Sequence, residues 1–98
     1  MEIKVYEENG VQVIAPQGKI DHVTVGSFEE KIKELGQANE KLMLDMEGVE
    51  YVSSAALRAI LNANDYMEDK GGLTIKNVNN KVMEILKITN FASYLNIV

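Results

Sequence analysis

Apolar and other side chains alternate along residues 3–15, which predicts two β-strands at about residues 2–8 and 11–16. The dipeptide Asn9-Gly10 between them favours the positive φ angles of a tight turn, so we expect the two strands to pair antiparallel. Pro16 is expected to end the second strand, because proline has no N–H group to donate to a neighbouring strand. The N-terminal segment is therefore predicted to be a β-hairpin.

Residues 25–35 place apolar side chains at three- and four-residue steps, which predicts an amphipathic helix. Ser27 and Glu30 have the spacing of a capping box, and Thr24 is the alternative N-cap. Gly36 is expected to end this helix, because glycine readily adopts the left-handed conformation found just past a helix C-terminus.

The rest of the chain alternates short apolar runs with amphipathic segments. The predicted elements are a strand over 42–46, a loop over 48–52, a helix beginning at Ser53 or Ser54, a strand around residues 73–75, a helix beginning at Asn79 or Asn80, and a short strand within 94–98. The resulting order, ββαβαβα(β), is that of a small α/β fold. An antiparallel hairpin is followed by parallel strands, which are joined by right-handed crossover helices.

The composition fits one small domain spanning residues 1–98. The chain has 46% hydrophobic residues, enough to form a core without metals or cross-links. It has no cysteine, which excludes disulfides, thiolate catalysis and cysteine-based metal sites. No apolar run approaches the roughly 18 residues of a membrane helix, and the N-terminus lacks the pattern of a signal peptide. We therefore expect a cytoplasmic protein without a membrane partner.

The charge and the motifs point away from nucleic-acid binding and from most enzymes. The net charge of −5 disfavours contact with phosphate backbones. With His22 as the one histidine, carboxylates would have to supply most ligands of a metal site, so no metal or cofactor is expected. The chain contains neither a nucleophile elbow nor a phosphate-binding glycine loop.

The most informative segment, residues 45–57, combines a strand end, a loop and a helix start. Ligands of open α/β sheets gather at the carboxyl ends of the strands. A serine at a helix start lies among unpaired N–H groups, where an attached phosphate would be electrostatically tolerated. Ser53 and Ser54 also fit a purely structural interpretation as N-caps, and spacing alone favours it. Asp45 is interpreted as a group that caps a loop at a strand end.

Residues 49–61 resemble the signature of the STAS domain of bacterial anti-sigma-factor antagonists. That pattern is approximately an apolar residue, Asp or Ser, Ser, Ser or Ala, Gly, Leu and then a helix. Three further segments resemble family elements in the right order: Gly18-Lys19-Ile20-Asp21, Leu42-Met43-Leu44-Asp45-Met46 and Ile88-Thr89-Asn90-Phe91. The resemblance spans nearly the whole chain, and the fold that it implies matches the predicted order of elements.

The resemblance implies regulation by partner switching rather than enzymatic activity. The unphosphorylated antagonist would bind an anti-sigma factor that is also a serine kinase and so free the sigma factor. The kinase would then phosphorylate the antagonist, which would dissociate, and a phosphatase would reset it. By position the phosphoacceptor is Ser54, with Ser53 as runner-up. The partner surface is expected to comprise residues 19–24, residues 48–54 and the exposed face of the second helix, with Asp21, His22, Ser53, Ser54 and Arg58 in contact. For Asp21, a cap at the start of the first helix is the alternative role.

Three positions depart from the family pattern. Ser53 stands where many members have aspartate. Ala56 replaces the usual glycine, so a methyl group is expected beside the acceptor, where it would restrict access of the kinase. Asn90 replaces a turn glycine, which is compatible with the left-handed conformation that asparagine tolerates.

The sequence leaves two other functions open. One is a STAS binding module without phosphorylation, in a transport or sensory assembly, for which Ser54 would be only a helix cap. The other is a small phosphotransfer or hydrolytic enzyme, for which the chain offers only Asp21, His22 and Asp45 as titratable groups. Of the three candidate functions, only that of a phosphorylated antagonist requires an exposed hydroxyl at Ser54.

Overall fold

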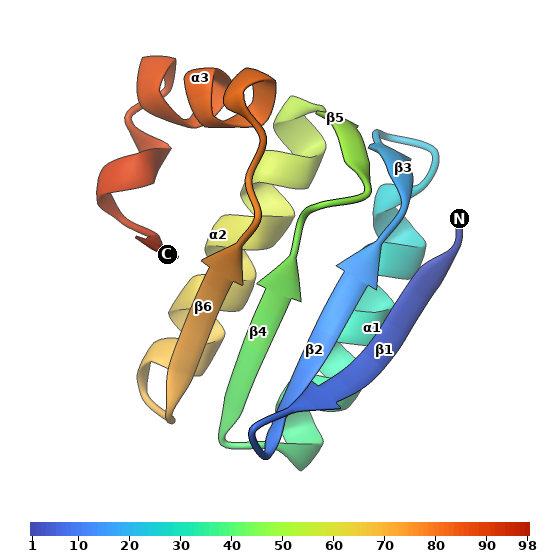
Figure 1. The fold of residues 1–98 in the computed structure, drawn as a ribbon, viewed down its shortest axis with the longest axis vertical. Coiled ribbons are helices and arrows are strands. Elements are labelled where there is room, and N and C mark those ends of the chain that lie inside the picture. The colour runs from blue at the N-terminus through green and yellow to red at the C-terminus, as the bar shows by residue number, and fades with distance from the viewer.

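The computed structural model describes residues 1–98. Three α-helices and seven β-strands follow one another along the chain (Figure 1). In chain order, they are β1 (Ile3–Glu8), β2 (Val11–Pro16), β3 (Gly18–Ile20), α1 (Val25–Ala38), β4 (Lys41–Asp45), β5 (Val49–Val52), α2 (Ser54–Glu68), β6 (Gly72–Lys76), α3 (Asn80–Ile88), a 3₁₀ turn (Phe91–Ser93) and β7 (Asn96–Ile97). The structure adds β3 and β5, two short strands, to the predicted order.

Five strands form the main sheet in the order β1-β2-β4-β6-β7. β1 and β2 form the predicted antiparallel hairpin, with Glu8 opposite Val11. The turn residues Asn9 and Gly10 have φ angles of 53° and 81°, the left-handed conformations that this dipeptide favours. The other neighbours pair parallel, as crossover connections through helices require. The predicted mixed α/β fold is therefore confirmed.

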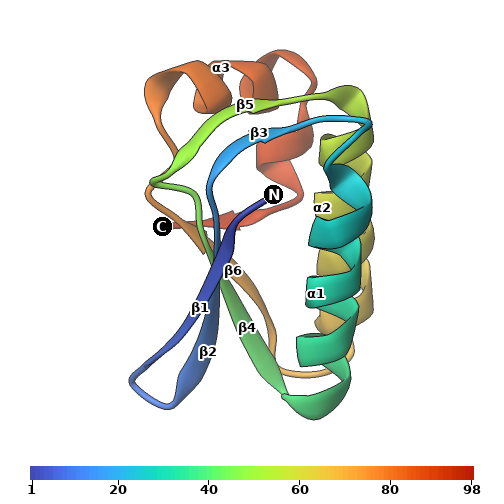
Figure 2. The same cartoon turned by 90° about the vertical axis from the view of Figure 1, so that its right-hand side faces the viewer.

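α1 and α2 lie side by side against one face of the main sheet, and α3 lies near the carboxyl ends of its strands (Figure 2). The core includes Phe28 of α1 and Ile60 of α2, together with Ile14, Leu44 and Ile75, which occupy matching positions on β2, β4 and β6. Truncation of a buried aromatic such as Phe28 would cost about 3–5 kcal/mol. None of the helices has the length and apolarity needed to cross a bilayer.

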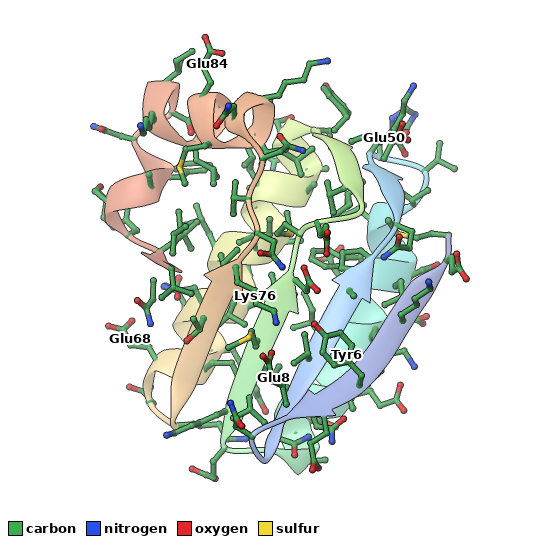
Figure 3. The ribbon with its side chains drawn as sticks, viewed as in Figure 1. Tyr6, Glu8, Glu50, Glu68, Lys76 and Glu84 are labelled. Atoms are coloured by element: carbon green, nitrogen blue, oxygen red, sulfur yellow. The ribbon has the colours of Figure 1, made fainter.

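The other face of the main sheet carries a polar network instead of a helix (Figure 3). The Tyr6 hydroxyl donates a hydrogen bond of 2.7 Å to Asp45 Oδ2. Lys76 Nζ pairs with the Glu8 carboxylate and lies 5.6 Å from the centroid of the Tyr6 ring. Val13, opposite Tyr6 in β2, is fully buried. The network therefore ties the edge strand β1 to β4 and β6 across β2.

α1 begins directly after Thr24, the alternative N-cap position, although the Thr24 side chain forms no capping hydrogen bond to the helix. Ser27 lies in the first turn, so the prediction of Ser27 as the N-cap is wrong. The helix also continues past Gly36, which is buried where α1 meets α2. A Cβ atom at Gly36 would lie 3.2 Å from the Tyr66 ring. This glycine therefore permits a close approach of two helices and does not end one.

Residues 48–52, predicted as a loop, contain β5, which pairs parallel with β3 in a separate two-stranded sheet. We call this sheet the β3–β5 ribbon. Gly18 N–H donates to the Gly48 carbonyl oxygen at 2.8 Å, and the Asn79 side-chain amide donates to the Val49 carbonyl oxygen at 2.9 Å. The ribbon leads the chain from the end of the main sheet to the N-termini of α1 and α2 (Figure 2).

Candidate functional site

The β3–β5 ribbon brings the two predicted site segments together. Ile20 of β3 lies opposite Val52 of β5, and Ser53 N–H donates to the Ile20 carbonyl oxygen at 2.9 Å. Asp21 follows Ile20 directly, just as Ser53 follows Val52. We call the surface formed by residues 19–24, residues 48–54 and the first turns of α2 the rim. Both segments were expected at one end of the fold, and they are, although they follow β3 and β5 rather than β2 and β4.

Ser53 is the N-cap of α2. Its backbone is extended, and its Oγ accepts a hydrogen bond of 3.2 Å from Ala56 N–H. Its carbonyl oxygen accepts the first helical bond, from Leu57 N–H at 2.9 Å. A serine in this position satisfies one of the N–H groups that a helix start leaves unpaired. The hydroxyl of Ser53 therefore has a structural role.

Ser54 is the first residue of α2, and its side chain is exposed. Its hydroxyl forms no hydrogen bond within the chain. The helix that starts here has 15 residues, so its first turn combines unpaired N–H groups with the positive end of the helix dipole. An anionic group attached to this hydroxyl would therefore meet a favourable local field.

The Asp21 carboxylate holds the turn that leads into α1. Its Oδ1 accepts hydrogen bonds from Val23 N–H at 2.9 Å and from Thr24 N–H at 3.1 Å. Because these two N–H groups, Val23 first, stabilise the charged form, they hold the pKa of Asp21 below its ordinary value. Asp21 thus caps the turn that leads into α1, which is close to the helix-entry role considered for it.

Thr24 completes this turn in a way that the sequence interpretation missed. Its hydroxyl donates to the Lys19 carbonyl oxygen at 2.8 Å and accepts from Asp21 N–H at 2.9 Å. The side chain thereby ties the end of β3 to the start of α1. The signal is present in the sequence as Asp-x-x-Thr, in which each side chain can bond to the backbone near the other.

Four further side chains on the rim are exposed. His22 and Arg58 are both exposed, and neither takes part in an ion pair. Val23, which the sequence interpretation did not single out, has 77% of its surface exposed, and Tyr51 on β5 has 44%. Exposed apolar groups beside charged ones are suited to contact with a protein partner.

The expectation for Ala56 is wrong. Ala56 is fully buried, so its methyl group packs into the core and does not lie on the rim surface. It is its N–H group, bonded to Ser53 Oγ, that contributes to the site. The replacement of glycine by alanine therefore leaves access to Ser54 unchanged.

The groups considered for enzymatic chemistry form no hydrogen bonds with one another. Asp45 is 8% exposed and accepts hydrogen bonds from Tyr6, Asn77 and the Glu47 N–H, on the sheet face away from α1 and α2. Burial raises its pKa, but these hydrogen bonds outweigh it and hold the pKa below its ordinary value. No group of three or more histidine and carboxylate side chains is placed to hold a metal ion. The group that the rim leaves free for chemistry is the exposed hydroxyl of Ser54.

Comparison with protein families matches residues 2–98 to the model of the STAS domain. Comparison with curated protein sequences finds no match to this chain.

Solved structures with a similar fold include three named for anti-sigma-factor antagonism or cell fate. An anti-sigma factor antagonist from Mycobacterium paratuberculosis has a TM-score of 0.90 and 20% identity, over 98% of this chain and 83% of that chain. A putative anti-sigma factor antagonist from Thermotoga maritima has a TM-score of 0.87 and 21% identity, over 97% of this chain and 84% of that chain. The phosphorylated form of SpoIIAA, a Bacillus cell fate determinant, has a TM-score of 0.74 and 15% identity, over 99% of this chain and 91% of that chain.

Proposed function

The chain belongs to the STAS domain family, and from this we propose that it is an anti-sigma-factor antagonist controlled by phosphorylation of Ser54. The unmodified rim binds an anti-sigma factor that is also a serine kinase, and the sigma factor is released. The kinase transfers the γ-phosphoryl group of ATP to the Ser54 oxygen, with release of ADP and the hydroxyl proton, and the modified antagonist dissociates. A phosphatase hydrolyses the phosphate and restores binding.

The observation that carries the proposal is the free hydroxyl of Ser54 at the start of α2. The side chain is exposed and unbonded, whereas Ser53 Oγ is engaged with Ala56 N–H. A kinase needs a hydroxyl that it can reach without disrupting the fold. Ser54 meets that requirement, and phosphorylation of Ser53, the runner-up, would break the α2 cap.

The same position explains how the switch acts without refolding. Phosphorylation adds a charge of about −1.5 to −2 and three acceptor oxygens. The N-terminus of α2 accommodates that charge locally, while on a protein with net charge −5 it repels an acidic partner surface. A bulky group at the centre of the rim also obstructs a closely packed interface.

Recognition is assigned to the exposed side chains around this hydroxyl. We place Asp21, His22, Ser53, Ser54 and Arg58 in the interface. An exposed ion pair of Arg58 with an acidic partner group is worth only about 0–1 kcal/mol. Val23 on the same rim is exposed, and fully burying an apolar side chain of this kind against a partner is worth about 1.5–3 kcal/mol, which is more than that pair.

The setting of this function is the cytoplasm, where ATP and sigma factors are found. Residues 1–98 act as one domain, and transcription is controlled through proteins, without direct contact to nucleic acid. One of the similar structures is a phosphorylated form of SpoIIAA, which supports the compatibility of this fold with a phosphate.

The proposal is tested by isolating the protein with its bound partners from its own cells. We expect an ATP-dependent serine kinase to copurify, and mass spectrometry of the chain after incubation with that kinase and ATP to place one phosphate on Ser54. Ser54→Ala should bind the kinase but accept no phosphate. Ser27→Ala, at an exposed serine in the first turn of α1, is the matched control and should behave as wild type.

Two outcomes would overturn the assignment. Phosphate on Ser53 in the wild type would move the acceptor by one residue. Partner binding that is unaffected by ATP, with phosphate on neither serine, would make the chain a binding module without this switch.

A further inference from the structure

β1 is an edge strand with one free side. It pairs with β2 only, and all of its residues except Ile3 are exposed. An unpaired edge presents a row of N–H and C=O groups to which another strand can be added. The question is which strand fits this edge.

Three observations establish which backbone groups of β1 are free. Pro16, which has no N–H, lies opposite Ile3, so that pair cannot exchange two hydrogen bonds. Gln17 N–H donates to the Glu2 carbonyl oxygen at 3.0 Å, and the two-residue turn makes Glu8 and Val11 a bonded pair. Bonded pairs alternate along an antiparallel ladder. The free groups are therefore those of the odd-numbered residues of β1.

We propose that two copies of this chain pair antiparallel through β1, with Tyr6 opposite Tyr6 on a two-fold axis. The odd-numbered residues of β1, whose backbone groups are free, then lie opposite odd-numbered residues of the second copy. Lys4 lies opposite Glu8 of the second copy, and the reverse contact forms on the other side of the axis. Even-numbered side chains share the open face of the sheet, so these charges meet there.

Charge selects this register from its alternatives, which differ by steps of two residues. A step in one direction places Glu2 opposite Glu8, and a step in the other places Glu7 opposite Glu7. Two steps place either Lys4 opposite Lys4 or Glu8 opposite Glu8. The proposed register avoids every like-charge pair and forms two pairs of opposite charge, and like charges directly opposite each other are destabilising.

The side chains in question are available for this contact. Lys4 is exposed and forms no ion pair within the chain. The Glu8 carboxylate pairs with Lys76 through Oε2, which leaves Oε1 for Lys4 of the second copy. Figure 3 shows Tyr6, Glu8 and Lys76 together on the open face beside β1. Pairing would thus extend an existing network across the axis.

The pairing leaves the rim free. The rim lies at one end of the molecule and the β1–β2 turn at the other (Figure 1). An antiparallel arrangement therefore directs the two rims to opposite ends of a continuous ten-strand sheet. The inference does not depend on the proposed function.

Sedimentation velocity over a wide range of concentration tests the pairing. We expect the wild type to form reversible dimers, and Lys4→Glu to raise the dimer dissociation constant by about tenfold or more. Lys33→Glu makes the same charge change at an exposed position on α1 and should dimerise as wild type. A wild type that stays monomeric throughout would overturn the proposal, as would a dimer that Lys4→Glu leaves intact.

Mixing two variants tests the register. Glu8→Lys alone places lysines opposite lysines, and Lys4→Glu alone places glutamates opposite glutamates, so each should dimerise more weakly than the wild type. A mixture restores both opposite-charge contacts and should form heterodimers. Failure of the mixture, with both variants folded by circular dichroism, would exclude this register.

Cross-linking gives an independent measurement. Because the chain has no cysteine, Tyr6→Cys on the two-fold axis should form a disulfide-linked dimer on mild oxidation. Val5→Cys, similarly exposed in the wild type but facing Glu7 across the axis, should cross-link far more slowly. Equal cross-linking of the two variants would contradict the proposed register.

Discussion

The hydroxyls of the adjacent residues Ser53 and Ser54 differ in their hydrogen bonding and exposure. Ser53 Oγ accepts a hydrogen bond of 3.2 Å from Ala56 N–H, whereas the Ser54 side chain is exposed and unbonded. One hydroxyl stabilises the start of α2, and the other is available to a partner. The two roles are therefore separable by single substitutions.

Ser53→Ala should lower the free energy of unfolding by about 1 kcal/mol, because it removes the α2 cap. Ser54→Ala should change it by less than about 0.5 kcal/mol, as is usual for an exposed position without a partner. Urea unfolding of the two variants beside the wild type measures both. A larger loss for Ser54→Ala than for Ser53→Ala would show that the caps are misassigned.

Two substitutions of Asp21 distinguish its structural role from its proposed role in recognition. Asp21→Ala should lower the free energy of unfolding, because Val23 N–H and Thr24 N–H lose their acceptor. Asp21→Asn keeps an acceptor oxygen and should be close to wild type in stability at neutral pH. If the carboxylate contacts the kinase, both variants should bind it more weakly in a titration. Full affinity in Asp21→Asn would limit the residue to its capping role.

Asp45 should contribute to the pH dependence of stability. The pKa of Asp45 is lower in the folded protein than in the unfolded chain, where it is about 4. The charged carboxylate therefore stabilises the folded protein above about pH 4. This stabilisation is lost as the pH falls through the pKa of the folded state. Asp45→Asn should therefore be less stable than wild type by about 1–3 kcal/mol at pH 7. That difference should shrink below about pH 4. Chemical unfolding from pH 7 to pH 3 measures it, and a constant difference would contradict this account.

Asn90 adopts a left-handed conformation, with φ of 68°. The departure from the family's glycine is thus accommodated as expected from the sequence. Asn90→Ala should lower stability by about 1 kcal/mol or more, because alanine tolerates the left-handed conformation less well than asparagine does. Asn90→Gly should be neutral or slightly stabilising. Thermal unfolding of the pair separates this backbone effect from loss of the side chain.

Features fixed by local chemistry could be predicted from the sequence. Asn9-Gly10 predicted its turn, and the serine pair and Asn79-Asn80 marked the starts of α2 and α3 to within one residue. These signals involve residues close together in the chain, so no knowledge of packing is needed.

Features that depend on distant contacts could not be predicted. β3 has three residues and one buried side chain, Ile20, so it lacks an alternating pattern, and it exists because it pairs with β5. The interpretation of Gly36 as a helix end is wrong because this glycine lies at a contact between α1 and Tyr66 of α2. That contact joins distant parts of the chain, so no local sequence signal indicates it.

The candidate site lies between these cases. The rule that strand ends meet at one edge of a sheet placed Asp21 near the two serines, and the structure agrees. The rule could not reveal the hydrogen bonds of Thr24, nor the burial of the Ala56 methyl group. Both depend on the direction of a side chain relative to its surroundings.

The β3–β5 ribbon has a consequence for divergence between related proteins. It shares no ladder with the main sheet, and outward side chains such as Lys19, Glu50 and Tyr51 are exposed. If the rim binds the partner as we propose, substitutions at these positions would change which protein is recognised and would leave the folding core intact. Related proteins in one cell would then keep separate partners through changes confined to this short segment.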